Sequence, residues 1–100
     1  MTALPQLDSL FHQPTRTRVA TLLSLEAHSF SELKAALAIT DGNLDAHLRK
    51  LSAAGYLHSR TVRDARPRTI YQLSDSGSKA FDEYIEALKV FVDLARAPKQ

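Results

Sequence analysis

The chain has 100 residues and a formal net charge of +2, and 44% of its residues are hydrophobic and 24% charged. These values predict one soluble globular domain over residues 1–100 and exclude a second independent core, a membrane span and a disordered chain. The chain contains no cysteine, which excludes disulfides, thiolate metal sites and thiol catalysis. Residues 1–13 lack a basic stretch followed by an apolar core, so we expect no signal peptide, no membrane anchor and a cytoplasmic location.

The small net charge conceals an uneven distribution. Residues 1–39 are neutral, residues 40–73 carry three excess positive charges, and residues 74–97 carry two excess negative charges. A basic segment followed by an acidic one indicates that the middle of the chain faces a polyanion and that the C-terminal part has a different role.

Three helices are predicted in the N-terminal part of the chain. The first, over residues 4–11, follows from leucine and phenylalanine side chains at helical spacing. The second, over residues 14–25, begins at a proline, which is tolerated in a first helical turn. Ser29 and Glu32 have the spacing of a capping box, which predicts a third, short helix that ends near Ala38.

A fourth helix is predicted from Asp41 to about Ala54. Thr40 is its N-cap and Gly55 ends it. Three leucines at helical spacing define its buried face. They are Leu44, Leu48 and Leu51. His47 lies at the edge of that face and is predicted to be a half-buried packing residue whose ring nitrogens meet backbone or water.

The opposite face of the same helix collects small, amide-bearing and basic side chains. They are Gly42, Asn43, Ala46, Arg49, Lys50 and Ala53. Such a face suits a close approach to DNA, because small residues let the backbone come near and amide and basic groups hydrogen-bond to bases or phosphates.

The pattern changes from helical to extended after this helix. Residues 56–62 and 68–73 are rich in β-branched and aromatic side chains, which predicts a hairpin. The connection over residues 63–67 is polar and basic and lacks the Asn-Gly signal of a two-residue turn, so a longer tip is expected.

The last helix is predicted over about residues 75–96, with more apolar surface than one contact needs. We therefore expect one face to cover the domain's own core and another to pack against a second copy of the chain, in a two-fold arrangement with the N-terminal helix. The residues expected at this dimer interface are Leu4, Leu7, Phe11, Tyr84, Leu88, Phe91, Val92 and Ala95.

Four segments together resemble the core of small winged helix-turn-helix transcriptional regulators of the MarR-like and ArsR-like groups. They are Phe30–Lys34, Thr40–Leu51, Ala54–Leu57 and Arg68–Gly77. The resemblance implies a mainly α fold with a small β-hairpin, as a winged helix-turn-helix with N-terminal and C-terminal dimerisation helices.

The resemblance also implies where DNA is contacted. Residues 41–54 become the recognition helix in the major groove, and residues 56–73 become the wing, along the backbone or in the minor groove. Asn43 is suited to read adenine, whereas Arg49 or Lys50 meets guanine or a phosphate. The predicted DNA-binding residues are Thr40, Gly42, Asn43, Ala46, Arg49, Lys50, Arg63, Arg66 and Arg68.

Each of these interpretations has an alternative. Arg49 and Lys50 also fit an ordinary solvated helix face, and Asn43 also fits a role in the cap begun by Thr40. Asp45 is placed to pair with Arg49 four residues later. At the level of the whole chain, the alternative to a DNA-binding regulator is a winged-helix module that binds an acidic protein.

Enzymatic and metal-dependent functions are not predicted. The four histidines are scattered without metal-ligand spacing. The chain has only three glycines and no phosphate-binding glycine loop, and no nucleophile with its base and orienting group is evident. We expect no cofactor, and the predicted partners are double-stranded DNA and a second copy of the chain.

Overall fold

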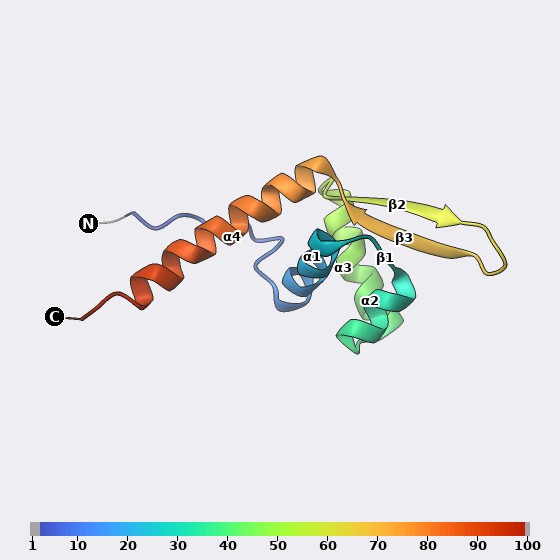
Figure 1. Cartoon of the computed structure of the whole chain (residues 1–100), viewed down its shortest axis with the longest axis horizontal. Coiled ribbons are helices and arrows are strands. Elements are labelled where there is room, and N and C mark those ends of the chain that lie inside the picture. Colours follow the sequence, from blue (N-terminus) through green and yellow to red (C-terminus); the bar gives the residue numbers. More distant parts are fainter. Residues whose placement is uncertain (1–2, 100) are drawn as a thin grey trace.

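The computed structural model describes residues 3–99. Its elements in chain order are α1 (Pro14–Leu25), β1 (His28–Ser29), α2 (Phe30–Leu37), α3 (Asp41–Ala53), β2 (Leu57–Val62), β3 (Arg68–Leu73) and α4 (Asp75–Ala95). Helices α1, α2 and α3 form a body from which α4 extends on one side and the β2–β3 hairpin on the other (Figure 1). The molecule is therefore elongated, with extents of 62 × 26 × 21 Å.

Local capping interactions determine where α2 begins and ends. The Ser29 hydroxyl accepts a hydrogen bond from the backbone N–H of Glu32 at 3.1 Å, and the Glu32 carboxylate accepts one from the backbone N–H of Ser29 at 2.8 Å. The bond from the Ser29 N–H to the carboxylate, and after it the Ser29 side chain, lower the pKa of Glu32, because hydrogen bonds to the charged carboxylate favour it. Ala38, with φ of 54°, ends the helix in the left-handed region. The predicted capping box and helix end are confirmed.

Helix α3 also matches its prediction. The Thr40 hydroxyl accepts a hydrogen bond from the backbone N–H of Asn43 at 3.1 Å, and Gly55 leaves the helix with φ of 79°, a conformation that glycine adopts without strain. The three predicted leucines are buried in the core. They are Leu44, Leu48 and Leu51.

The predicted N-terminal helix over residues 4–11 is wrong, because this segment has no helix and turns at residues 9–11. The Asp8 carboxylate accepts hydrogen bonds from the backbone N–H of Leu10 at 2.9 Å and from the hydroxyl of Tyr56 at 3.1 Å. The turn places the Phe11 ring in the core, stacked on Tyr56 at a centroid distance of 5.1 Å. Long-range burial of an aromatic ring thus outweighs the local helical spacing.

The hairpin is part of a three-stranded antiparallel sheet in the order β1-β3-β2. Strands β2 and β3 confirm the predicted hairpin, with Ser59 opposite Tyr71. The additional strand β1 was not predicted, since it has two residues and pairs through His28 and Ser29 with the other edge of β3. A strand this short has no periodicity to detect.

Helix α4 begins in contact with the chain that follows α3. The Ser74 hydroxyl accepts a hydrogen bond from the backbone N–H of Gly77 at 3.0 Å, and the Ser74 N–H donates to the Tyr56 carbonyl at 2.9 Å. A Cβ atom on Gly77 would lie 2.1 Å from that same carbonyl oxygen. Glycine is therefore required at this crossing.

The hydrophobic core lies between α1, α2 and α3 and is closed by the first half of α4. The buried apolar residues are Phe11, Val19, Ala20, Leu23, Leu33, Leu37, Leu44, Leu48, Leu51, Leu57, Phe81 and Tyr84. Phe11 and Tyr84, which were expected at a dimer interface, are buried within the chain itself, so neither is exposed to a partner. Within residues 3–99, no helix is long and apolar enough to span a bilayer.

Candidate nucleic-acid interface

The groove face of α3 is the surface formed by the six residues opposite its buried leucines. All six are exposed: Gly42, Asn43, Ala46, Arg49, Lys50 and Ala53. Because the leucines hold the helix against the core, this face is directed outward along the whole helix. The prediction that these six side chains share one exposed face is confirmed, and their contact with DNA stays a prediction.

Asn43 takes part in the N-terminal cap only through its backbone. Its N–H donates to the Thr40 hydroxyl, and its side chain is exposed and forms no hydrogen bond to any residue between 3 and 99. The amide group therefore keeps its donor and acceptor for an external ligand. The Thr40 hydroxyl also keeps its own hydrogen for donation, since it accepts in the cap.

The two basic residues of the groove face differ in their surroundings. The Arg49 Nε donates to the Asp45 carboxylate at 2.7 Å, as the spacing predicted. Lys50 forms no ion pair within the described part of the chain. The Arg49 side chain is 80% exposed, and such an exposed pair contributes only about 0–1 kcal/mol, so a phosphate can displace the carboxylate.

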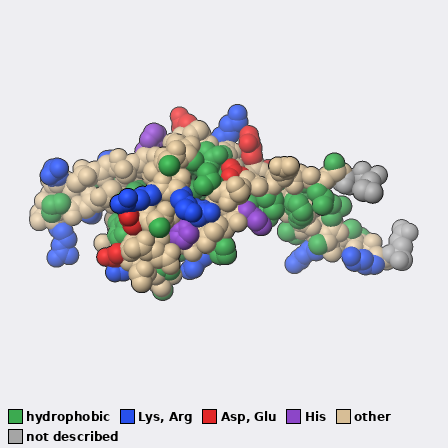
Figure 2. Space-filling view, turned by 180° about the vertical axis from the view of Figure 1, so that it is seen from behind, with side chains coloured by type: hydrophobic (Ala, Val, Ile, Leu, Met, Phe, Trp, Pro, Cys, Tyr) green, Lys and Arg blue, Asp and Glu red, His purple; other side chains and the backbone are tan. Residues whose placement is uncertain are grey.

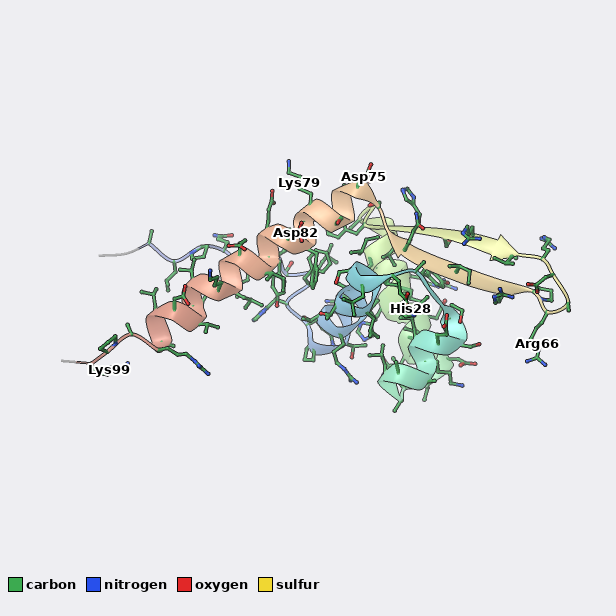
Figure 3. The ribbon with its side chains drawn as sticks, viewed as in Figure 1. His28, Arg66, Asp75, Lys79, Asp82 and Lys99 are labelled. Atoms are coloured by element: carbon green, nitrogen blue, oxygen red, sulfur yellow. The ribbon has the colours of Figure 1, made fainter. Side chains whose placement is uncertain are left out.

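The tip of the wing, residues 63–67, is organised by one carboxylate. Asp64 accepts hydrogen bonds from the backbone N–H of Arg66 at 3.1 Å and from Nη1 of Arg68 at 2.9 Å. These contacts lower the pKa of Asp64, so the carboxylate is ionised and neutralises Arg68. Arg63 and Arg66 have no acidic partner among residues 3–99, and Arg66 points away from the body at the tip (Figure 3).

A buried arginine behind α3 was not predicted as part of the site. Arg16 is 9% exposed, and its Nη1 donates to Nδ1 of His47 at 3.1 Å while its Nε donates to the Leu10 carbonyl. Burial, Arg16 and Lys50 lower the pKa of His47. The expectation that the ring meets only backbone or water is wrong. The signal in the sequence is that Arg16 shares the buried face of α1 with Val19.

Exposed hydrophobic side chains gather at one end of the molecule. Figure 2 shows lysine and arginine side chains at the wing tip and over the body, and hydrophobic side chains gathered where the N-terminal segment meets the far part of α4. The acidic and basic side chains of Asp75, Lys79 and Asp82 lie along the outer side of α4 (Figure 3). The wing tip thus lies at the opposite end of the molecule from this apolar surface (Figure 2).

Helix α4 carries exposed apolar side chains beyond its core contacts. Ile85 and Leu94 are each 42% exposed and Val92 is 50% exposed. Of the residues expected at the dimer interface, Leu7 and Leu88 pack partly against the core. The other four residues expected at the dimer interface are exposed or half-buried, and we call them the apolar patch: Leu4, Phe91, Val92 and Ala95. No group of three or more metal-ligating side chains occurs in the range 3–99.

The chain is similar to known proteins both in sequence and in structure. A sequence profile of the winged helix DNA-binding domain matches residues 16–92. The chain is 37% identical over 78 residues to the uncharacterised protein MJ0432 of Methanocaldococcus jannaschii, a match that covers 76% of this chain and 85% of that protein. A transcriptional regulator homologue from Pyrococcus horikoshii superposes with a TM-score of 0.83 at 28% identity, over 87% of this chain and 88% of that one.

More distant structures share the fold. A MarR-family regulator from Enterococcus faecalis has a TM-score of 0.80 at 22% identity and covers 88% of this chain and 81% of its own. PadR from Bacillus subtilis, solved with operator DNA, has a TM-score of 0.65 at 17% identity over 73% and 47% of the two chains. The chain belongs to the winged helix DNA-binding domain family, and its family and fold are those of transcriptional regulators, not enzymes.

Proposed function

We propose that the protein is a sequence-specific regulator of transcription that binds double-stranded DNA as a homodimer on a pseudo-palindromic site. The observation that carries the proposal is the exposed groove face of α3, opposite three buried leucines and centred on small residues. In the winged helix architecture this helix enters the major groove. PadR, which shares the fold, was solved on operator DNA.

Base reading in this proposal comes from the N-terminal half of α3. The free amide of Asn43 is able to pair with adenine through two hydrogen bonds, since only its backbone is used in the cap. Gly42 and Ala46 let the helix approach closely because neither extends beyond a methyl group. Thr40 and Lys50 bind phosphates, and Arg49 binds guanine or phosphate after leaving Asp45.

The wing supplies binding that does not depend on sequence. Arg63 and Arg66 at the tip are free of acidic partners, so each releases condensed counterions when it meets a phosphate or enters a narrow minor groove. Arg68 contributes less as long as Asp64 holds it. The wing therefore adds affinity, and α3 adds specificity.

The homodimer is supported by the apolar surface of α4. Val92 is 50% exposed and shares one stripe of α4 with Phe91 and Ala95, beyond the part that covers the core. A two-fold axis beside this stripe places a second copy against the same residues. A dimer sets two recognition helices about 34 Å apart, which is one turn of duplex. That spacing explains why a two-fold regulator recognises a two-fold site.

Selection of the purified protein against random duplex DNA tests this function. We expect enrichment of a symmetric motif with two half-sites one helical turn apart, and affinity that falls steeply with salt. Asn43→Ala is expected to cost about 1–3 kcal/mol at one base position and relax the preference there. Arg66→Ala is expected to weaken all sequences alike and to reduce the salt slope by about one per protomer.

The two variants serve as controls for each other, because both lie on exposed surface and leave the core intact. Gel-shift titrations at several salt concentrations separate their effects. Absence of binding to any duplex, or binding that does not respond to salt, contradicts the proposal.

A further inference from the structure

The His47 side chain lies at the border between the buried face and the groove face of α3. The ring is half-buried. Arg16 of α1 donates a hydrogen bond from its Nη1 to Nδ1 of His47 at 3.1 Å. Arg16 is in turn held by the Leu10 carbonyl, which accepts from its Nε. The imidazole ring is therefore fixed from behind by a buried side chain that is itself anchored.

This contact determines which ring nitrogen carries the proton. A guanidinium group has only N–H donors and accepts no hydrogen bond, so Nδ1 of His47 is the acceptor. Burial of the ring and the positive charges of Arg16 and Lys50 also lower the pKa of His47 from its ordinary value of 6.5. The ring is then neutral near pH 7, and its single N–H group is at Nε2.

The Nε2–H group is open to the outside. It has no hydrogen-bond partner among residues 3–99. Every buried side-chain nitrogen and oxygen in that range has a partner, so Nε2 is not buried. Nε2 therefore reaches solvent. A donor held in one orientation, solvent-accessible and unpaired, is prepared for an external acceptor.

The position of His47 on the helix indicates which acceptor. At about 100° per residue it lies about 40° from Asn43 and about 60° from Lys50 around the axis of α3. His47 lies one turn after Asn43 along α3 and outside the groove face, on its border with the buried face. A side chain in that position meets the wall of the groove, which is formed by phosphates. We propose that the Nε2–H of His47 donates a hydrogen bond to a backbone phosphate, with Arg16 as its positioning residue.

The inference rests on the proposed DNA binding and adds to it a neutral contact that charge patterning does not reveal. Because the ring carries no net charge, the contact contributes affinity without releasing a counterion. The salt dependence of binding therefore distinguishes it from the contacts of Lys50 and the wing. Loss of His47 lowers affinity at every salt concentration alike, whereas loss of Lys50 also flattens the salt slope.

The test compares three variants of the full chain on the selected duplex. His47→Leu removes both ring contacts and is expected to weaken specific and non-specific binding about tenfold per protomer, with an unchanged salt slope. His47→Gln keeps an acceptor for Arg16 and a donor beyond it, so we expect near wild-type affinity. Lys50→Ala is the charged comparison and is expected to reduce the slope by about one per protomer.

A histidine methylated at Nε2 removes only the proposed donor. Placed at position 47, it is expected to reproduce the loss seen with His47→Leu even if that variant proves unstable. The matched control is the same methylation at His12, whose Nδ1 is likewise engaged, at 2.9 Å from the Tyr84 hydroxyl, and which is exposed and not among the predicted DNA-binding residues. Duplexes with single neutral methylphosphonates then identify the phosphate, because its neutralisation weakens the wild type and not His47→Leu.

The outcomes separate the two proposals. If the wild type binds no duplex, the proposed function is overturned, and this inference with it. If the wild type binds and the methylated variant at position 47 binds equally well, only the role of His47 is overturned. If the methylated variant at position 47 binds more weakly, but no single methylphosphonate weakens the wild type to the same extent, the phosphate contact is also overturned.

Discussion

At the scale of single residues, Arg16 and His47 show how a charged side chain in the core connects two parts of the chain. Arg16 is buried, donates to the Leu10 carbonyl on one side and to His47 of α3 on the other. A buried guanidinium is costly unless its N–H groups are satisfied. The cost is offset here by contacts that fix α3 relative to the N-terminal segment.

The lowered pKa of His47 predicts how stability responds to pH. Below the ordinary value of 6.5 the unfolded chain binds a proton at this ring and the folded chain, which is kept neutral by burial, Arg16 and Lys50, binds less. The free energy of unfolding therefore falls as pH decreases through 6.5, and this contribution is complete above it. Urea unfolding at about pH 7.5 and about pH 5.5 should show a larger loss for the wild type than for His47→Gln. Equal losses in the two proteins would rule out this role for the ring.

At the scale of elements, the wing illustrates how an acidic residue limits a basic surface. Asp64 shapes the tip by accepting from the backbone N–H of Arg66 and at the same time neutralises Arg68. Asp64→Asn keeps an acceptor for the turn and removes the charge. We expect DNA affinity to rise on the order of fivefold and the salt slope to steepen by about one per protomer.

Asp93→Asn is the matched control for this change, because it removes the same charge from the exposed far part of α4. Fluorescence anisotropy over a range of salt concentrations compares the two. Identical slopes for the two variants would mean that Arg68 does not reach DNA even when it is released.

The contact between the start of α4 and Tyr56, which follows α3, depends on one glycine. In Gly77→Ala the new Cβ would lie 2.1 Å from the Tyr56 carbonyl oxygen, a backbone atom with no freedom to move aside alone. We expect a loss of about 2–3 kcal/mol in the free energy of unfolding and a drop in Tm of about 10 °C or more. Gly42→Ala is the control, since its Cβ meets nothing within 4 Å and should raise stability by up to about 1 kcal/mol. Circular dichroism during thermal unfolding measures the Tm of both variants. A Gly77→Ala protein as stable as Gly42→Ala would refute the close approach.

At the scale of the whole molecule, α4 and the wing project in opposite directions from one small body (Figure 1). Hydrophobic side chains gather beside the far part of α4, and the basic wing tip lies at the opposite end (Figure 2). This separation suits a protein that meets a second copy through one end and a polyanion through the other.

The dimer proposal predicts the effect of a charge placed in the apolar patch. Val92→Arg would bury the new arginine of each protomer against the same residue of the partner, and two buried like charges oppose dimerisation. Light scattering after size exclusion should therefore show a monomer, with helicity retained. DNA affinity should fall about a hundredfold, because two linked half-sites become independent. Leu25→Arg adds the same charge at a residue that is 75% exposed on α1 and should leave the dimer intact. A dimeric Val92→Arg, or a monomeric wild type at micromolar concentration, contradicts the proposal.

Much of the fold follows from local sequence features. The capping box of Ser29 and Glu32, the Thr40 cap and the stop at Gly55 are formed by residues within a few positions of each other. The leucine spacing in α3 likewise defines its buried face and, by difference, its groove face. The exposed placement of every predicted DNA-binding residue on α3 follows from that single periodicity.

The wrong and missing predictions concern segments whose structure depends on residues distant in the sequence. A helix over residues 4–11 is consistent with local spacing, yet Tyr56, far along the chain, draws Asp8 and Phe11 into a turn. Strand β1 exists only because β3 offers it an edge.

The sequence by itself determined the order of α1 to α4 and of the β2–β3 hairpin, the caps, and which face of α3 is exposed, because these depend on spacing along one segment. Only the tertiary structure decided that Arg16 is buried against His47, that Tyr84 belongs to the core, and that Asp64 occupies Arg68. The physical reason is that burial and charge pairing are properties of the space around a side chain. That space is filled by segments which the local pattern does not specify.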